Sequence, residues 1–155
     1  MQLSHLLAVA LATTGGLGFN LNRTATAETK RGVIPVSHKG CYATSVDPDE
    51  TKTAGEKFKE WTEGGSKVGR ENFHAEYENG SAMFVCNCAP VGIAVPAHEI
   101  DDALQQIQAH CGRSRGGWLW AHDWNKGFNL ADAARVTYPT LIRSVCPCGY
   151  GIGDR

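Results

Sequence analysis

The chain has 155 residues, and its 15 Lys and Arg against 16 Asp and Glu give a formal net charge of −1 at pH 7. A near-neutral chain without a block of basic residues argues against nucleic acid or an anionic membrane surface as the main partner. Its length predicts one folded domain, because single domains are usually of this size.

An apolar run from Leu6 to Leu17 stands near the start of the sequence. It is too short to span a bilayer, which takes about 20 apolar residues. It has the length of the hydrophobic core of a secretory signal peptide, and Ala25-Thr26-Ala27 fits the small-residue pattern before a cleavage site. We therefore predict that residues 1–27 are a signal peptide. The alternative, a buried N-terminal helix, is disfavoured by glycines at the end of the run.

Lys30 and Arg31 form a dibasic pair shortly after this segment. Such a pair resembles the maturation site of eukaryotic, especially fungal, secretory proteases, and a solvated pair in a linker is the alternative. Cleavage would make residues 28–31 a short propeptide and residues 32–155 the mature domain, in which acidic residues outnumber basic ones. No later segment is apolar enough for a membrane anchor. We expect a secreted, extracellular, soluble monomer.

Six cysteines follow the predicted propeptide. An even number behind a signal peptide indicates three disulfides formed in an oxidising compartment. The rival is a metal site, but zinc sites usually separate their close cysteine pairs by at least two residues, whereas two pairs here are C-x-C. On an extended strand both sulfurs of such a pair point to one face, about 7 Å apart. This favours two separate bridges, with the connectivity left open. The disulfide candidates are Cys41, Cys86, Cys88, Cys111, Cys146 and Cys148.

The mature part is predicted to begin with an irregular arm over residues 32–49, which Cys41 attaches to the core. From Glu50 to Thr62 apolar residues recur at helical spacing with charges opposite, which predicts a first helix. The pair Gly64-Gly65 ends it.

The clearest local signal is Asn79-Gly80 between two strand-like runs, residues 73–77 and 82–88. It predicts a β-hairpin with a type I′ turn, because both residues tolerate positive φ. Asn79-Gly80-Ser81 is also an N-glycosylation sequon, and a turn tip would expose it.

Pro96 opens a second predicted helix, whose core-facing stripe from Ile100 to Cys111 ends before Gly112. Cys111 is expected to attach the end of this helix to the sheet. Residues 118–124 predict a strand buried on one face and partly covered on the other. A last extended stretch from Arg135 to Cys146 is expected to return the final cysteine pair to the sheet.

The element order is therefore helix, hairpin, helix, strand, strand. The strand–helix–strand crossover over residues 82–124 fits parallel pairing, and such crossovers are right-handed. The predicted fold class is α+β: a small disulfide-stapled sandwich of the split β-α-β type, in which an antiparallel-rich sheet carries two helices on one face.

The layout of residues 86–124 resembles that of small secreted cysteine-rich effectors of plant-associated fungi. A cysteine-bearing strand leads to a helix ending in His110-Cys111-Gly112, and then to a Gly-rich loop and a strand led by Gly117-Trp118. This order is similar to that of the necrosis-inducing effector family and of the α/β-sandwich killer toxins of smut fungi. The resemblance implies a killer-toxin-like fold and a secreted effector or toxin-like role in virulence. The chain differs from those toxins in having fewer cysteines and an acidic mature part.

A small secreted ribonuclease is the enzymatic alternative. His74 and Glu76 lie on one face of a predicted strand and, with His122 and Arg113 or Arg115, could supply the base, acid and cation that RNA cleavage requires. No ribonuclease motif spacing accompanies them, and a surface pair is the better interpretation of His74 and Glu76. We predict no enzymatic activity.

Two further histidine–carboxylate pairs, His98-Glu99 and His122-Asp123, could ligate a metal. No H-E-x-x-H spacing supports them, and solvated surface residues are the better interpretation. The Gly-rich loop over residues 112–117 follows a helix instead of opening one, so it lacks the helix N-terminus that holds phosphate. We predict neither a metal nor a cofactor.

The predicted binding region is this loop with the strand that follows it. Exposed arginines beside tryptophans are the residue types enriched at binding hot spots; the alternative is that the tryptophans belong to the core. A second exposed patch is expected at Trp124 and Lys126. The expected partner is a host or competitor protein or cell-surface component, and an inert cell-wall or surface protein is a third hypothesis. The candidate binding residues are Arg113, Arg115, Trp118, Trp120, Trp124 and Lys126.

Overall fold

A computed structural model describes residues 33–137, 146 and 148. The predicted signal peptide and dibasic pair lie outside the described residues. The elements in chain order are β1 (His38–Ser45), α1 (Pro48–Glu63), β2 (Asn72–Glu78), β3 (Ser81–Asn87), α2 (Ala97–Cys111), β4 (Arg115–Ala121), the short 3-10 turn η1 (His122–Trp124), β5 (Lys126–Asp132) and α3 (Ala133–Thr137).

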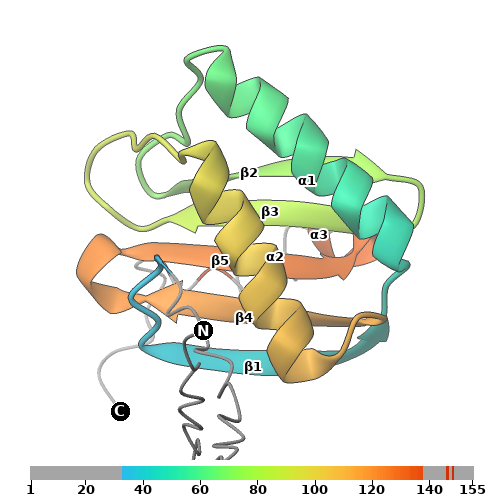
Figure 1. Ribbon diagram of the computed structural model, residues 1–155. Helices are drawn as coiled ribbons and strands as arrows, with labels where there is room; N and C mark the ends of the chain where they lie inside the picture. The colour runs from blue at the N-terminus through green and yellow to red at the C-terminus, as the bar shows by residue number, and fades with distance from the viewer. Residues whose placement is uncertain (1–32, 138–145, 147, 149–155) are drawn as a thin grey trace, which may run out of the picture. The chain divides into compact units, whose positions relative to one another are not determined.

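The strands form one five-stranded sheet in the order β1-β4-β5-β3-β2, and every neighbouring pair is antiparallel. Helices α1 and α2 lie side by side across the same face of this sheet (Figure 1). Strands β3 and β4, which α2 connects, run parallel to each other, but β5 lies between them and pairs with both. This is the split β-α-β arrangement, so the predicted fold class is confirmed.

Three strands differ from the expectation. The strand expected over residues 118–124 is β4, which begins and ends three residues earlier, and residues 122–124 form η1. The predicted irregular arm contains β1, which pairs with β4 from His38 opposite Trp120 to Ser45 opposite Arg115, with an irregularity between Cys41 and Ser45. Strand β5 was not predicted, although it is the central strand. The extended stretch expected from Arg135 is wrong at its start, because residues 133–137 form α3, and residues 138–145 lie outside the described residues.

Both long helices begin and end near their predicted limits. Helix α1 begins two residues early, because the Asp47 carboxylate accepts hydrogen bonds from the backbone N–H groups of Asp49 (2.8 Å) and Glu50 (3.0 Å) and thereby caps it. Helix α2 follows Pro96, and Gly112 ends it with φ of 89°, a backbone conformation that favours glycine.

The predicted hairpin is confirmed: β2 and β3 pair in register from Asn72 opposite Asn87 to Glu78 opposite Ser81. Only Asn79 of the two central residues has positive φ, at 44°. A type I′ turn needs positive φ at both positions, so the predicted turn type is wrong although its place is right.

Hydrophobic side chains form one cluster on each face of the sheet. The alternation of β3 shows the division, because Met83 and Val85 face the helices whereas Phe84 and Cys86 face the other side. We call these clusters the helix-side core and the second core. The helix-side core contains Ile34, Val46, Ala54, Phe58, Val68, Met83, Val85, Val95, Ile100, Ala103, Ile107, Leu119, Ala121, Phe128 and Leu130. The second core contains Tyr42, Ala82, Phe84, Cys86, Ala131, Val136, Cys146 and Cys148.

Three disulfides connect these parts, as predicted. The two C-x-C pairs supply separate bridges, Cys86–Cys146 and Cys88–Cys148, which attach the C-terminal cysteines to the second face of the sheet. The third, Cys41–Cys111, joins β1 to the end of α2. The protein is therefore a small disulfide-stabilised α+β domain. Among the described residues, no helix is both long and apolar enough to cross a membrane.

Candidate functional site

The arginines and tryptophans of the predicted binding region belong to opposite faces of β4. A Cβ atom on Gly117 would lie 2.7 Å from the Cys111 sulfur, so this position faces α2. Because side chains alternate along a strand, Arg115 shares that face, and Trp118 and Trp120 lie on the other. The single arginine–tryptophan surface expected from the sequence is thus divided in two.

Each tryptophan packs across a glycine of a neighbouring strand. Gly40 of β1 is opposite Trp118, and a Cβ atom there would lie 2.7 Å from the indole Nε1. Gly127 of β5 is opposite Trp120, and a Cβ atom there would lie 2.9 Å from the ring carbon Cε3. Any larger residue at either glycine would displace an indole, so the glycines determine how both rings lie on the sheet.

Both indoles keep part of their surface accessible. Trp118 is half-buried and packs against the second core, whereas Trp120 is half-buried and belongs to neither core cluster. The exposed His38 lies opposite Trp120 on the edge strand β1. We call Trp118, Trp120 and His38 the tryptophan surface. It joins amphipathic rings to a rigid sheet, an arrangement suited to binding.

The two candidate arginines differ in their contacts. Arg113 is exposed in the turn between α2 and β4. Arg115 is also exposed, but its Nε donates a hydrogen bond to the carbonyl oxygen of Tyr42 (2.7 Å) across the β1–β4 pair. Arg115 therefore also supports the sheet edge, and its substitution would test structure together with binding.

The expected exposed patch at Trp124 and Lys126 is wrong. Lys126 is 5% exposed, and its Nζ lies 2.6 Å from Oε2 of Glu99. The same Nζ donates to the carbonyl oxygen of Ala94 and lies 5.2 Å from the centre of the Trp124 ring, which packs against the helix-side core. This lysine is a buried structural cation, which the sequence did not show because its partner lies in another element.

His74 and Glu76 lie on one face of β2, as predicted, with His74 Nε2 2.7 Å from Glu76 Oε1. The imidazole stacks on the Trp61 indole of α1, with ring centres 3.6 Å apart and an interplanar angle of 9°. Both side chains are half-buried under the helix. The pair therefore forms part of the contact between α1 and β2.

The proposed ribonuclease residues are not gathered into one site. Strands β5 and β3 separate β4 from β2, and three strand steps of about 4.8 Å place β4 roughly 14 Å from His74. Arg113 precedes β4 and His122 follows it, so they lie near opposite ends of that strand. His74 and Glu76 consequently lie together on β2, at a distance from Arg113, Arg115 and His122.

The two histidine–carboxylate pairs considered as metal ligands, and not predicted to be such, do not form one cluster with each other. Glu99 is engaged by Lys126, and His122 and Asp123 are exposed, with 3.6 Å between Nδ1 and Oδ1. In the part of the chain that the structure describes, the possible ligands that do come together are Cys41, His110 and Cys111. The sequence indicated the two cysteines as staples, but His110 was noted there only as part of the family resemblance.

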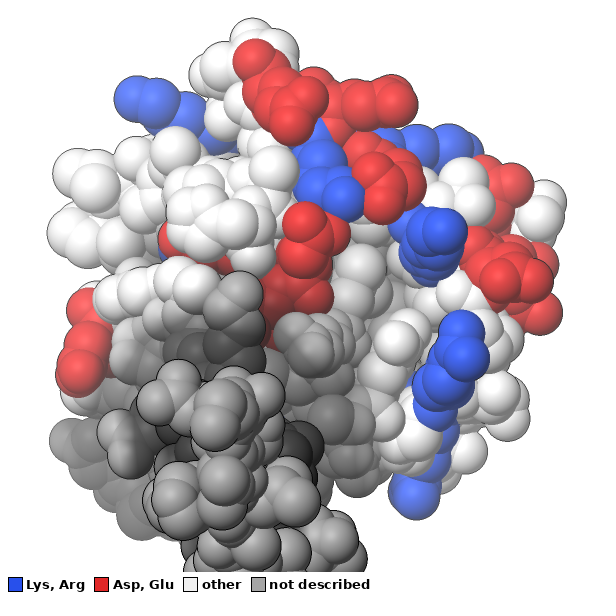
Figure 2. Space-filling view, in the orientation of Figure 1, with Lys and Arg blue, Asp and Glu red and all other residues white. Residues whose placement is uncertain are grey.

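Several charges on the helix-covered side of the sheet form ion pairs with one another. Acidic and basic side chains alternate there in Figure 2. The Nζ atom of Lys59 in α1 lies 2.8 Å from Oε1 of Glu56 in the same helix and 2.8 Å from Oδ1 of Asp101 in α2. Partial burial, the largest single influence, lowers the pKa of Lys59, but its hydrogen bonds to Asp101 and Glu56 outweigh it and raise that pKa. Charge pairing makes this side a weaker candidate for binding than the tryptophan surface.

We expect Asn79 to carry an N-linked glycan, because it is exposed at the β2–β3 turn within a sequon. The sequon hydroxyl, Ser81 Oγ, is buried and donates to Oε2 of Glu50 (2.9 Å), so attachment must precede folding of the hairpin. Protein secreted by a glycosylating host should gain gel mobility after treatment with a glycan-releasing amidase. Asn79→Gln should remove the shift, and an untreated wild-type chain of unmodified mass would contradict the expectation.

No protein-family model and no curated protein matches this chain, so the expected resemblance to the effector and killer-toxin families finds no support there. One similar solved structure is the tandem DUF26 ectodomain of the cysteine-rich receptor-like protein PDLP8 from Arabidopsis thaliana. Identity is 11%, the TM-score is 0.42, and the match covers 67% of this chain and 47% of that chain. The match thus spans about half the length of that neighbour. A likeness of this degree identifies neither a family nor a function.

Proposed function

We propose that this protein is a secreted, effector- or toxin-like binding protein that engages a host or competitor protein or cell-surface component through Trp118 and Trp120. Three disulfides in a small domain support the extracellular part of this proposal, since such bridges persist in oxidising compartments. The observation that carries the binding role is the pair of half-exposed indoles on the face opposite the long helices.

Preorganisation makes these indoles effective anchors. Tryptophan is among the residues most enriched at binding hot spots, because a ring buries a large area on contact. Each indole is already held across a glycine, so binding costs little additional side-chain entropy. Trp120 belongs to neither core cluster, and its free surface can contact a partner without unpacking the fold.

Trp120→Ala is expected to weaken the activity of the oxidised protein about 30-fold or more, the effect of losing a hot spot of roughly 2 kcal/mol. The assay is ion leakage from infiltrated leaf tissue as a function of protein concentration, with reduced and alkylated protein as the inactive reference. Circular dichroism and the thermal midpoint should show that the variant keeps its fold.

Trp61→Ala is the matched control, because Trp61 is also half-buried but lies on the helix side. It should retain activity wherever it remains folded. Full activity of Trp120→Ala, together with loss of activity in Arg113→Ala, would move the binding surface to the turn after α2.

Absence of leakage from the wild-type protein in susceptible tissue would remove cell killing as the activity. Retention in the wall fraction instead of the medium would favour an inert wall protein.

We propose further that the protein acts by binding and not as a ribonuclease. The separation of His74 from Arg113 and His122 across the sheet supports this choice. The test is incubation of the purified protein with a labelled RNA, followed by gel analysis. Cleavage by the wild-type protein that is lost in His74→Ala would overturn the proposal.

A further inference from the structure

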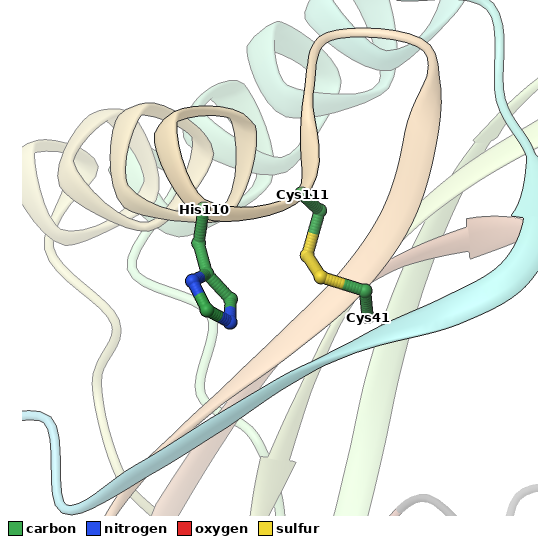
Figure 3. A group of neighbouring side chains, drawn as sticks. All are labelled: Cys41, His110 and Cys111. Carbon is green, nitrogen blue, oxygen red and sulfur yellow. A yellow bond between two sulfur atoms is a disulfide. The ribbon is translucent and has the colours of Figure 1, made fainter.

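The bridge between β1 and α2 has a histidine beside it. Cys111 is the last residue of α2 and is bonded to Cys41 of β1, and His110 precedes it in the chain. Figure 3 shows the imidazole alongside the two sulfur atoms. One ring nitrogen and both sulfurs all lie within 4.8 Å of one another. The three side chains thus present one nitrogen and two sulfur atoms at a single point.

This bridge is also the one of the three in which both cysteines are half-exposed. Cys41 and Cys111 are both half-exposed, and His110 is exposed. In the Cys86–Cys146 bridge, by contrast, the two residues are 0% and 6% exposed. In the Cys88–Cys148 bridge, Cys88 is half-exposed but Cys148 is only 5% exposed. Thiol–disulfide exchange requires access of the attacking thiolate to a sulfur. A reductant is therefore expected to open Cys41–Cys111 first.

We propose that the reduced Cys41 and Cys111, together with His110, form a binding site for Zn²⁺. In the reducing step, two molecules of a low-molecular-weight thiol become one disulfide, and the two cysteine sulfurs receive two electrons and two protons. Zn²⁺ then binds both sulfurs as thiolates and the imidazole as its neutral form, and two protons are released to solvent. The two thiolate charges balance the charge of the ion.

Once the bridge is reduced, the two cysteines and His110 can reach the spacing of a tetrahedral ion. Zn–S distances of about 2.3 Å and Zn–N distances of about 2.0 Å place neighbouring ligand atoms roughly 3.3–3.8 Å apart. The backbone holds the two cysteines in reach of this spacing, with 5.5 Å between their Cα atoms. Cys111 Sγ lies close above Gly117, where a Cβ atom would be 2.7 Å away, so the sulfur is positioned by the sheet and not by the bridge alone.

Exposure of His110 leaves the fourth position of the ion open to water, as in zinc sites with three protein ligands. The consequence is that β1 and α2 are cross-linked under both oxidising and reducing conditions. A disulfide joins β1 to α2 in oxidising surroundings, and the ion joins the same two elements in reducing ones.

The test begins with the oxidised full chain, treated with increasing amounts of a phosphine reductant under native conditions. Differential alkylation and mass spectrometry should show Cys41 and Cys111 free while the other two bridges remain closed. After anaerobic removal of the reductant, Co²⁺ is added as the spectroscopic probe. One Co²⁺ per chain should bind with thiolate charge-transfer and tetrahedral d–d absorption, and Zn²⁺ should displace it. The oxidised protein should show neither band.

His110→Ala should weaken Co²⁺ binding about tenfold or more, since even the loss of an outer partner of a metal ligand has such an effect. His98→Ala is the matched control, because His98 is an exposed histidine on the same helix. Prior opening of another bridge, absence of thiolate bands in the selectively reduced protein, or equal Co²⁺ affinity of His110→Ala and wild type would each overturn the proposal.

Discussion

Glu99→Ala is expected to lower the free energy of unfolding by about 3–5 kcal/mol, because it leaves a buried lysine charge without its partner. The Glu99 and Lys126 side chains are only 9% and 7% exposed, and 2.6 Å separates their charged atoms. Urea denaturation of the oxidised protein, followed by tryptophan fluorescence, measures the change. The slope against urea concentration should remain that of the wild type, so that the shift reports stability alone.

Lys57→Ala provides the comparison, because the Lys57–Glu78 pair has a similar separation of 2.7 Å but is 46% and 29% exposed. Surface pairs contribute about 0–1 kcal/mol, since water already solvates both charges. The double variant Glu99→Leu/Lys126→Met should be more stable than Glu99→Ala, because it removes both charges from the interior. A loss in Glu99→Ala no greater than that in Lys57→Ala would contradict the buried ion pair.

Cys86→Ala/Cys146→Ala is expected to cost about 4 kcal/mol, a loss that would leave a domain of this size marginally stable. The bridge spans 60 residues, and its removal releases the corresponding chain entropy in the unfolded state. It also joins two buried members of the second core, so packing is lost as well. Thermal denaturation measures the loss of stability, and leaf-tissue leakage of the same preparation measures the accompanying change in activity.

Comparison with Cys41→Ala/Cys111→Ala separates the effect of chain entropy in the unfolded state from the effect of lost packing. This bridge spans 70 residues, so chain entropy alone predicts nearly the same loss for both double variants. Its cysteines are half-exposed, however, and their removal should leave the second core intact. A greater loss from Cys86→Ala/Cys146→Ala is therefore expected. Equal losses would show that packing around Cys86 contributes nothing measurable.

Features carried by neighbouring residues could be predicted well. The Asn79-Gly80 turn, the stripe that ends α2 at Cys111 and the division of the C-x-C pairs between two bridges are present in the structure. Turn chemistry and helical spacing act within a few residues, which is why the sequence shows them directly. Even here only Asn79 of the two central turn residues adopts positive φ, so the turn type could not be predicted from the Asn-Gly pair.

Strand β5 shows where local signals fail. Gly127 and Asn129 are weak strand formers, yet both are buried in the central strand. Pairing with β3 and β4 on both sides stabilises this strand, and the carboxamide Oδ1 of Asn129 accepts a hydrogen bond from the Tyr42 hydroxyl (2.7 Å). Gly127 leaves the room that the Trp120 indole occupies. Both residues serve contacts with elements distant in the sequence.

The sequence by itself determined that this protein is a disulfide-stapled α+β domain with a hairpin, two helices on one face and two separately bridged C-x-C pairs. Only the tertiary structure decided which cysteines pair, that Lys126 is buried against Glu99, and that Arg115 and Trp118 belong to opposite faces of the sheet. The reason is physical: helix and turn preferences arise between near neighbours, whereas strand order, ion pairing and the choice of sheet face depend on residues tens of positions apart that meet only when the chain is folded.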